Sequence, residues 1–334
     1  MTRRVVVTGG AGFVGAAVVE TLSHQGDDVV VLDSLRPDVH QDGGARARQR
    51  LAQVPLEVAD VRDRAEVERI LRGADAVVHL AAKVDIQGRY REFARVNITG
   101  TRNVVSACRR AGVARLVHVS TPAVAHHGSA LVGAPAGPAD PRSARGHYAR
   151  SKAAAEWVAL AADAAPDGPA TVVVRPHLVW GPGDTQLIGR IIARARAGRL
   201  PVVGSGAALI DTTYVTNAAD ALVAALDRCA AARGQALVVS NGEPRPVAEL
   251  LTAICRAAGA APPRRSVPRS VAFGAGAVVE ALWSGRGEPP MTRFLAEQLS
   301  TAHWFDQRRT REVLRWTPRV SIAEGLAALA RHGA

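Results

Sequence analysis

The stretch Val5-Val6-Val7-Thr8-Gly9-Gly10-Ala11-Gly12-Phe13-Val14-Gly15 decides the fold of this chain, because a β-branched run leads directly into a glycine-rich turn. Helical composition follows over residues 14–22. Glycines at positions 9, 12 and 15 permit a tight turn, close approach of the backbone to a pyrophosphate, and close helix–strand packing. A helix that starts at this turn points its free N–H groups and positive dipole end at the phosphates. The stretch therefore predicts a dinucleotide site that uses Gly9, Gly12, Phe13, Val14 and Gly15.

Outward from this turn, short apolar strands alternate with helical segments. The expected strands cover residues 5–8, 29–32, 56–59, 76–80, 116–119 and 171–174. The expected helices between them cover residues 14–22, 66–71, 93–111 and 153–162. Continuous apolar strands separated by helices indicate a parallel sheet that is covered on both faces. The predicted fold class is α/β, a doubly wound parallel sheet of the Rossmann type.

The strand–helix rhythm loosens after Arg175, where Pro- and Gly-containing turns separate helices at 187–197 and 247–258. We expect residues 1–177 to form the dinucleotide-binding domain, with 207–243 returning to it. Residues 178–206 and 244–334 are expected to form a smaller substrate-binding part. Within it, the apolar, glycine-broken segment Val271–Trp283 is predicted to be a helix over the substrate pocket. A shallow membrane contact is the alternative for this segment.

Length and composition exclude several classes of protein. The 334 residues are 48% hydrophobic and 22% charged, the balance of a globular protein. The net charge of +12 is spread along the chain without a nucleic-acid-binding motif, so no nucleic-acid partner is expected. No apolar run is long enough to span a bilayer, and the N-terminus has no signal-peptide pattern. The three scattered cysteines fit a reducing cytoplasm.

The choice between NAD and NADP depends on Asp33, which is followed by Ser34 at the end of the second expected strand. A carboxylate at this position would accept hydrogen bonds from both adenosine ribose hydroxyls, whereas a 2′-phosphate would meet its negative charge. We therefore expect NAD, although the nearby Arg36 makes NADP the less favoured alternative. The other interpretation of Asp33 is a carboxylate that caps a helix or holds a loop.

Two further segments are expected at the cofactor because of their place in the fold. Asp60-Val61 follows the third strand, where an acidic residue often meets the adenine amino group. Leu80-Ala81-Ala82-Lys83 follows the fourth strand, where small residues let the backbone pass beside a dinucleotide.

The candidate catalytic pair is Tyr148 and Lys152, at the start of a predicted helix. A four-residue step places both side chains on one helix face. A lysine near the tyrosine hydroxyl favours the phenolate, so we expect the pKa of Tyr148 to fall toward the working pH. Tyr148 would then be a general base toward an alcohol or a general acid toward a ketone. Lys83 and Lys152 are the only lysines in a chain that otherwise uses arginine.

With these motifs together, the sequence resembles the extended short-chain dehydrogenase/reductase family over nearly its full length. The stretches that carry the resemblance are Thr8–Gly15, His79-Leu80-Ala81-Ala82, Asn97-Ile98-Thr99-Gly100-Thr101, Tyr148 with Lys152, and Arg175-Pro176. The resemblance implies that Lys152 also holds the nicotinamide ribose, and that Pro176, His177 and Leu178 lie at the cofactor. It also implies a homodimer that pairs the helices at 93–111 and 148–162.

The resemblance adds two groups to the catalytic site. A Ser or Thr after the fifth strand hydrogen-bonds the reacting oxygen, and this position matches Thr121, with Ser120 immediately before it. Asn97 matches the active-site asparagine of the family. The alternative role of Asn97, pinning a bend in the backbone, remains open.

Two groups within the family compete. Sugar-nucleotide epimerases and dehydratases share the first half, but they usually carry an asparagine at the position of Leu178 and an arginine at that of Ile210. An apolar residue cannot hydrogen-bond a diphosphate. The same segments resemble 3β-hydroxysteroid dehydrogenases, sterol-4α-carboxylate 3-dehydrogenases and reductases of long-chain 2-alkyl-3-keto acids. The carrying stretches are Ala82–Asp85, Arg175–Asp184 and Ile210–Val215.

The sequence thus predicts an NAD-dependent oxidoreductase that acts at a secondary alcohol or ketone of a bulky apolar substrate. A sugar-nucleotide epimerase or dehydratase is the alternative enzyme, and a nucleotide-sensing regulator is the alternative outside enzymes. His126-His127 is interpreted as a pair of exposed loop histidines without metal partners. Trp180 and Trp283 are interpreted as either pocket walls or core residues.

Overall fold

A computed structural model describes residues 2–37, 39–40, 42–85, 88–126, 128–282 and 292–332. Its main body is a sheet of seven parallel strands in the order β12-β7-β5-β4-β1-β2-β3. The strands are β1 (Arg4–Thr8), β2 (Asp28–Asp33), β3 (Leu56–Val58), β4 (Ala76–His79), β5 (Arg115–Val119), β7 (Ala170–Pro176) and β12 (Ala236–Val239). The chain reverses its direction across the sheet after β3, so β1 and β4 lie side by side at the topological switch point, where dinucleotides bind in such folds.

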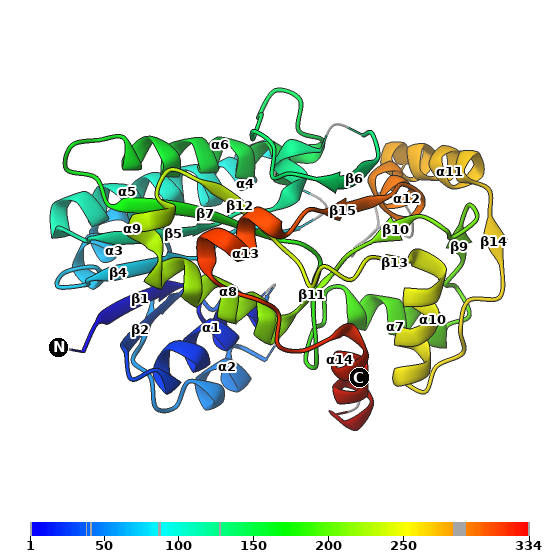
Figure 1. Cartoon of the computed structure of the whole chain (residues 1–334), viewed down its shortest axis with the longest axis horizontal. Helices are drawn as coiled ribbons and strands as arrows, with labels where there is room; N and C mark the ends of the chain where they lie inside the picture. The colour runs from blue at the N-terminus through cyan, green and yellow to red at the C-terminus, as the bar shows by residue number, and fades with distance from the viewer. Residues whose placement is uncertain are drawn as a thin grey trace.

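Helices cover both faces of this sheet (Figure 1). On one face lie α1 (Phe13–His24) and α8 (Val215–Asp227), with the short α2 (Ala45–Arg50) and α9 (Cys229–Ala232) beside them. On the other face lie α3 (Arg64–Ile70), α5 (Gly100–Ala111) and α6 (Gly146–Asp163). Successive strand residues alternate between the two cores: Val5 and Val7 join the α1–α8 side, whereas Val6 joins the α3–α5 side. This two-sided burial is the doubly wound fold that the apolar strands predicted.

The second part of the molecule has short strands and a separate apolar core. Its strands are β6 (Leu131–Ala134), β8 (Val179–Trp180), β9 (Val202–Val203), β10 (Leu209–Ile210), β11 (Thr213–Tyr214), β13 (Arg245–Pro246), β14 (Ser266–Val267) and β15 (His303–Phe305). Its helices are α7 (Ile188–Arg196), α10 (Val247–Ala257), α11 (Arg269–Leu282), α12 (Arg293–Ser300) and α14 (Ile322–His332). Figure 1 shows these elements beyond the carboxyl ends of the sheet strands. The two parts therefore enclose the end of the sheet where the expected site residues lie.

The structure differs from the expected elements in three places. Helix α6 begins at Gly146, two residues before Tyr148, where the sequence predicted a helix to open, and seven before the range 153–162 of clearest helical composition. The helix expected at 93–111 is divided into α4 (Tyr90–Phe93), a π-helix (Ala94–Thr99) and α5. After the second part, α13 (Arg308–Leu314) returns to the main body, where Leu314 and Trp316 join the core on the α1–α8 side. No helix among the described residues is long and apolar enough to cross a bilayer.

Candidate active site

The glycine turn is shaped by close approach of backbone to backbone. Gly9 has φ +71°, and a Cβ built there would lie 2.7 Å from the Ala81 nitrogen. A Cβ on Gly15 would lie 2.1 Å from the Gly9 carbonyl oxygen, so only glycine lets α1 pack this close to the turn. Gly12 precedes α1 without a side-chain cap, which leaves the first N–H groups of the helix, from Phe13 onward, free to bind an anion. The turn thus forms a cradle that fits a pyrophosphate.

The Asp33 carboxylate is buried at the end of β2 and already has backbone partners. It accepts hydrogen bonds from the Ala11 nitrogen at 3.1 Å and from the Leu35 nitrogen at 3.0 Å, and His40 Nε2 lies 3.7 Å away. Each carboxylate oxygen has a second lone pair, so Asp33 can hold the loop and still accept from a ribose. Ser34 follows it at the rim of the turn.

The segment after β3 is held by local contacts. Asp60 forms a bidentate ion pair with Arg62, at 2.6 Å for the shortest contact, and Arg36 lies close enough to act on its charge. Val61 is buried against Gly100, where an added Cβ would meet the Val61 side chain at 2.7 Å. The carboxylate of Asp60 is therefore already paired with the Arg62 guanidinium.

Asn97 clamps the segment after β4 from inside the π-helix. Its side-chain oxygen accepts from the Lys83 nitrogen at 2.7 Å, and its Nδ2 donates to the Lys83 carbonyl at 3.1 Å. The same Nδ2 donates to Ser151 Oγ at 2.8 Å, and Ser151 lies on α6 beside Lys152. The structure thus gives Asn97 the backbone-pinning geometry and links it to the catalytic helix. The Lys83 ammonium pairs with Asp85 at 2.5 Å.

Beneath this clamp, a buried histidine joins the glycine turn to α5. The Ala81 nitrogen donates to Thr8 Oγ1, which in turn donates to His79 Nδ1 at 2.7 Å. His79 Nε2 lies 3.0 Å from Thr101 Oγ1, and that hydroxyl donates to the Asn97 carbonyl at 2.6 Å. These partners assign one proton, on Nε2. Burial, aided by the charge of Lys152, lowers the pKa of His79 to about 3, so the ring is neutral.

Tyr148, Thr121 and Lys152 meet where α6 passes the carboxyl end of β5. Thr121 follows β5, and its side chain lies close enough to the Tyr148 hydroxyl to lower the pKa of that group. Lys152 Nζ donates to the Val119 carbonyl at 2.6 Å. The Ser120 hydroxyl, next to Thr121 in the chain, is buried and has no hydrogen-bond partner among the described residues.

The protonation of the pair differs from the sequence prediction. Burial raises the pKa of Tyr148 to about 12, against the lowering effect of the Thr121 hydrogen bond, so the predicted fall of this pKa is wrong. Burial lowers the pKa of Lys152 to about 8, although the charge of Glu156 opposes the fall. Tyr148 therefore carries its proton at neutral pH, the state of a general acid.

Glu156 belongs to a buried ion pair that the sequence did not reveal. Its carboxylate contacts the Arg175 guanidinium at 2.5 Å and 3.0 Å, and neither side chain is more than 1% exposed. Arg175 also donates to the carbonyls of Ala136 and Gly137. The ion pair ties α6 to β7 one helical turn beyond Lys152, so it fixes the position of the catalytic helix.

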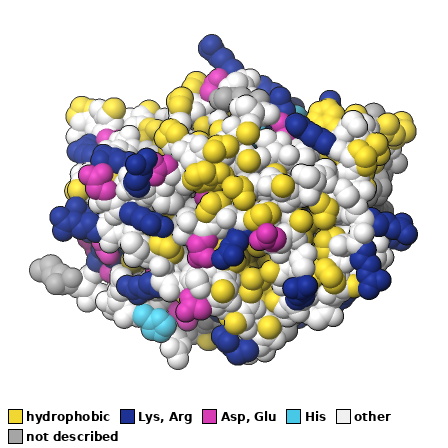
Figure 2. Space-filling model, turned by 45° about the vertical axis from the view of Figure 1, so that its right-hand side comes forward, with side chains coloured by type: hydrophobic (Ala, Val, Ile, Leu, Met, Phe, Trp, Pro, Cys, Tyr) yellow, Lys and Arg dark blue, Asp and Glu magenta, His cyan; other side chains and the backbone are white. Residues whose placement is uncertain are grey.

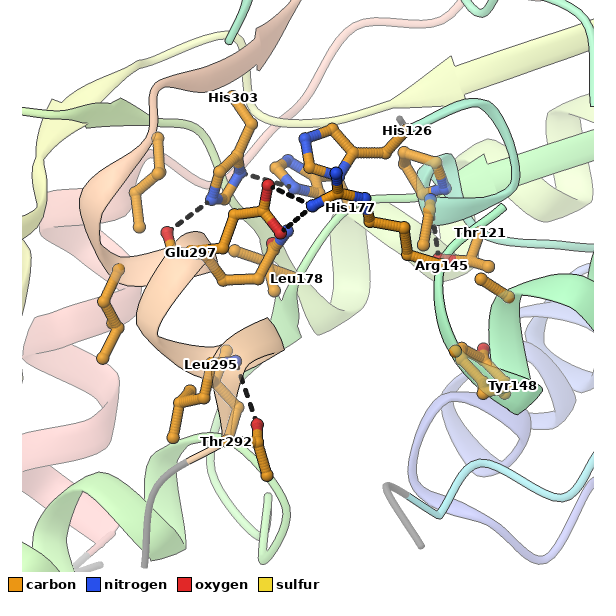
Figure 3. Close-up of a pocket in the computed structure, with 18 of the residues that line it drawn as sticks. Thr121, His126, Arg145, Tyr148, His177, Leu178, Thr292, Leu295, Glu297 and His303 are labelled. Carbon is orange, nitrogen blue, oxygen red and sulfur yellow. Dashed lines mark hydrogen bonds and ion pairs between the residues drawn. The ribbon is translucent and has the colours of Figure 1, made fainter. Parts of the chain in front are cut away.

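Tyr148 and Thr121 line a cavity of about 1240 Å³ between the two parts of the molecule (Figure 3). Most of its opposite wall is aliphatic and consists of Leu178, Ile188, Ile191, Leu250, Leu251 and Ile254. Leu178, where a sugar-nucleotide enzyme usually has an asparagine, lies on this wall, as does Ile210. Trp180 lines the cavity and is also fully buried, so both interpretations of it hold; Trp283 lies outside the described residues.

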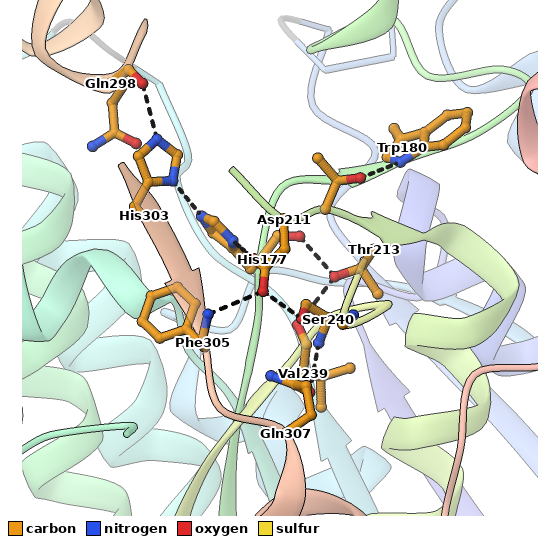
Figure 4. A network of polar contacts seen from close by, with 12 residues as sticks. His177, Trp180, Asp211, Thr213, Val239, Ser240, Gln298, His303, Phe305 and Gln307 are labelled. Atoms are coloured by element: carbon orange, nitrogen blue, oxygen red, sulfur yellow. Dashed lines mark hydrogen bonds and ion pairs between the residues drawn. The ribbon is translucent and has the colours of Figure 1, made fainter. Parts of the chain in front are cut away.

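A polar network closes one end of the cavity (Figure 4). His177 Nδ1 lies 2.5 Å from the buried Asp211 carboxylate, which also accepts from Ser240 Oγ at 2.7 Å. His303 Nε2 faces the Gln298 carbonyl at 2.9 Å, and its Nδ1 faces His177 Nε2 at 3.1 Å. Because a carbonyl only accepts, His303 Nε2 carries a proton.

These contacts orient the two rings of the network. Burial lowers the pKa of His303 to about 3, so its ring is neutral, and with its proton on Nε2 its Nδ1 accepts a hydrogen bond from His177 Nε2. The other nitrogen of His177, Nδ1, faces the Asp211 carboxyl group. The ring of His177, a residue that the resemblance placed at the cofactor, lies at this end of the cavity against Asp211.

The sequence analysis did not place three residues, Arg145, Glu297 and His126, at the cavity that they line. Arg145 and Glu297 form an ion pair at 2.8 Å from α6 to α12, across 152 positions of sequence. No local pattern signals such a distant contact. His126 is 5% exposed and lines the cavity, so its interpretation as an exposed loop residue is wrong. His127 lies outside the described residues.

A glycine cradle at the switch point and a Tyr/Lys pair beside an apolar cavity define a dinucleotide-dependent oxidoreductase fold. The sequence model described as the NAD dependent epimerase/dehydratase family matches residues 5–240. The chain belongs to this family, and the predicted Rossmann-type fold and NAD dependence are confirmed.

Individual relatives refine the comparison. The chain is 40% identical to a 2-alkyl-3-oxoalkanoate reductase of Stenotrophomonas maltophilia, over 98% of each chain. It is 30% identical to a 3beta-hydroxysteroid-dehydrogenase/decarboxylase (isoform 2) of Arabidopsis thaliana, over 96% of this chain and 60% of that one. Among solved structures, the dTDP-glucose 4,6-dehydratase DesIV of Streptomyces venezuelae, with NAD and TYD bound, matches with a TM-score of 0.74 and 26% identity, over 98% and 96% of the two chains. The predicted resemblance to the reductase and hydroxysteroid dehydrogenase group is confirmed.

Proposed function

We propose that this protein is an NAD-dependent oxidoreductase that interconverts a ketone and a secondary alcohol on a bulky apolar molecule. The observation that carries the proposal is the position of Tyr148 and Thr121. Both residues lie on the wall of a large cavity whose opposite wall is aliphatic. An apolar substrate would gain free energy from burial there, at about 25 cal/mol per Å² of apolar surface.

The site residues then take defined roles. Tyr148 donates its proton to the ketone oxygen in reduction and takes it back in oxidation, while Thr121 holds that oxygen and Ser120 offers its unpartnered hydroxyl. Lys152 supplies a positive charge beside the cofactor ribose, and Asn97 holds the adjoining backbone. When bound, NADH would supply the hydride in ketone reduction, and NAD would accept it in alcohol oxidation. The proton and the hydride balance the reaction in each direction.

The cofactor would be held by residues that border the cradle. We assign the pyrophosphate to the backbone of Gly9, Gly12 and Phe13–Gly15, and the adenosine ribose to Asp33 and Ser34. The remaining cofactor contacts are assigned to Asp60, Val61, Leu80, Ala81, Ala82, Lys83, Pro176, His177 and Leu178. For Asp60, the backbone is the better candidate because its carboxylate is paired with Arg62.

The substrate class follows from the aliphatic wall and from the relatives. We propose a long-chain 2-alkyl-3-oxoalkanoate, as the name of the Stenotrophomonas relative indicates, with 3β-hydroxysteroids as the competing substrate. Leu178 and Ile210 offer no hydrogen bond to a diphosphate, so a sugar nucleotide fits this wall poorly.

The decisive experiment follows nicotinamide absorbance with purified protein. NADH or NADPH is offered with 2-alkyl-3-oxoalkanoates, NAD with 3β-hydroxysteroids, and NAD with UDP- or dTDP-sugars. Tyr148→Phe should bind NAD normally but lose turnover by about a thousandfold. Full activity of that variant would overturn the mechanism, and conversion of a sugar nucleotide without net NADH would make the protein an epimerase.

Three further features of the organisation belong to the same proposal. Residues 178–206 and 244–334 would supply most of the substrate site, except that 308–316 packs on the main body. A homodimer would form through α5 and α6. A cytoplasmic location agrees with three cysteines that are all buried and unpaired. Size-exclusion chromatography with light scattering tests the homodimer, and cell fractionation tests the location.

A further inference from the structure

Helix α11 has apolar side chains on the face that it turns to solvent. Val271, Val278 and Leu282 are 57%, 58% and 76% exposed, and Ala275 between them is exposed as well. The spacing of these four residues is i, i+4, i+7 and i+11, which places them in one stripe along the helix. We call these four residues the outer stripe. No described segment of the chain covers them.

The opposite side of α11 belongs to the molecule. Ala272 and Gly276 are buried, and a Cβ on Gly276 would lie 2.6 Å from the backbone of Arg293 at the start of α12. Phe273 and Glu280 line the large cavity. The helix is therefore a single-layer wall with the cavity on one side and the outer stripe on the other. Figure 1 shows α11 at the edge of the molecule, outside α12.

Five exposed arginines lie at the start of α11 or in the segments that lead into β9 and β14. Arg196 and Arg199 precede β9, and Arg264 and Arg265 precede β14. Because β9 and β14 pair in parallel, Arg199, Arg264 and Arg265 lie toward the same end of this two-stranded sheet. Arg196 ends α7, and Arg269 begins α11. All five are exposed, and none forms an ion pair with a described residue.

The local charge is strongly one-sided. Residues 185–205 contain four arginines and no acid, and residues 258–282 contain three arginines and the single acid Glu280. Glu280 is already paired with Arg293 at 2.6 Å. Figure 2, which brings this end of the molecule forward, shows hydrophobic side chains interspersed with Lys and Arg.

We propose that α11 docks on the surface of an anionic lipid bilayer, with the outer stripe in the headgroup region and the five arginines against lipid phosphates. An apolar stripe flanked by arginines is the pattern of a helix that lies in the plane of a membrane interface. Arginine also binds phosphate in a bidentate fashion. The cavity lies directly behind the docked helix, so an apolar substrate could pass from lipid to the cavity with little exposure to water.

This inference goes beyond the proposed function, and its test does not require activity. Purified protein is sedimented with vesicles of phosphatidylcholine alone and of phosphatidylcholine mixed with phosphatidylglycerol, at low and high salt. We expect binding to the mixed vesicles only, weakened by salt because the arginine–phosphate attraction is screened. Failure to bind mixed vesicles at low salt would overturn the proposal and leave the oxidoreductase assignment intact.

Matched variants locate the contact. Replacement of Arg264, Arg265 and Arg269 by Gln should weaken vesicle binding by about a hundredfold, since each basic residue near the surface contributes several-fold. The control replaces Arg48, Arg50 and Arg72, which are also exposed, and removes the same charge elsewhere. Equal loss in both triple variants would show a general charge effect and overturn the docking site.

The outer stripe has its own control. The triple variant Val271→Ser, Val278→Ser and Leu282→Ser should weaken binding by more than about tenfold. Val58→Ser with Val132→Ser, at exposed valines elsewhere, should leave it unchanged. Thermal melting and NAD titration confirm that each variant is folded. One outcome would overturn the bilayer proposal: the unmodified protein does not bind vesicles but self-associates, and only the stripe variant abolishes that self-association. The outer stripe would then be covered by a second copy of the chain.

Discussion

The two halves of the site are built in different ways. At the cofactor turn, the shape comes from backbone that approaches backbone, with the Gly15 Cα close to the Gly9 carbonyl. At the closed end of the cavity, the shape comes from side chains that hydrogen-bond over long sequence separations, as in the His177–Asp211–Ser240 network. A backbone site tolerates no added atom, whereas a side-chain network loses one contact at a time. The two halves should therefore respond differently to substitution.

The largest effect is expected at the cofactor turn. Gly15→Ala places a Cβ 2.1 Å from the Gly9 carbonyl, an overlap that only backbone movement relieves. We expect loss of more than about 4 kcal/mol of unfolding free energy, or no folded protein, together with loss of NAD binding. Urea unfolding and NAD titration measure both. Gly274→Ala, where an added Cβ meets nothing, is the control, and a stable NAD-binding Gly15→Ala protein would contradict the backbone account.

The next effect concerns the buried ion pair that ties α6 to β7. Glu156→Gln leaves the buried Arg175 guanidinium without a counter-charge, which should cost about 3 to 5 kcal/mol in unfolding free energy. The exposed Glu312→Gln should change little. Chemical denaturation at neutral pH provides the comparison. Equal stabilities of the two variants would mean that water or another anion satisfies Arg175.

A smaller and more local effect is expected at the cavity end. Asp211→Asn replaces the carboxyl group that His177 faces with an amide, whose nitrogen meets either His177 or the two donors, Ser240 Oγ and Phe305 N. We expect a loss of about 2 kcal/mol in unfolding free energy and a raised KM for the ketone, with NAD affinity unchanged. Steady-state kinetics and NAD titration separate these effects, with the exposed Asp167→Asn as control. A parallel loss of NAD affinity would show that the two halves are not independent.

The smallest effect is a pH dependence that belongs to Lys152. Its pKa of about 8 lies below the ordinary value, so the ammonium is present below pH 8 and is lost as the pH rises through about 8. Tyr148, with a pKa of about 12, keeps its proton throughout this range. Ketone reduction should therefore fall severalfold between about pH 7 and 9. A flat rate–pH profile over this range would remove Lys152 from the mechanism.

The sequence predicted the features that depend on local patterns and missed those that depend on contacts between distant segments. The apolar runs at 5–8 and 76–80 and the glycine spacing carry local information, so the parallel sheet and the cofactor turn could be recognised. The π-helix at Ala94–Thr99 could not, because it coincides with contacts from Asn97 to Lys83, which is distant in the sequence. Neither could the Arg145–Glu297 or Arg175–Glu156 pairs, whose partners meet only in the folded chain.

The pKa of Tyr148 was predicted wrongly because it too depends on the folded surroundings of the side chain. Its spacing from Lys152 was correct, but the sequence did not show how deeply the hydroxyl is buried or that the lysine reaches the Val119 carbonyl. Burial of His126 was missed for the same reason. Spacing along a helix predicts which residues are neighbours, whereas the surrounding solvent and charge depend on the whole fold.

The hydrogen-bond chain through His79 has a spectroscopic consequence. Each donor in it points the same way, from the Ala81 nitrogen through Thr8 and His79 to Thr101 and the Asn97 carbonyl. Buried hydroxyl protons held in this way exchange slowly with solvent, so those of Thr8 and Thr101 should give resolved proton resonances, as should the Nε2 proton of His79. These three resonances would report on the junction of the glycine turn and α5, and a ligand that shifts the turn would move them together.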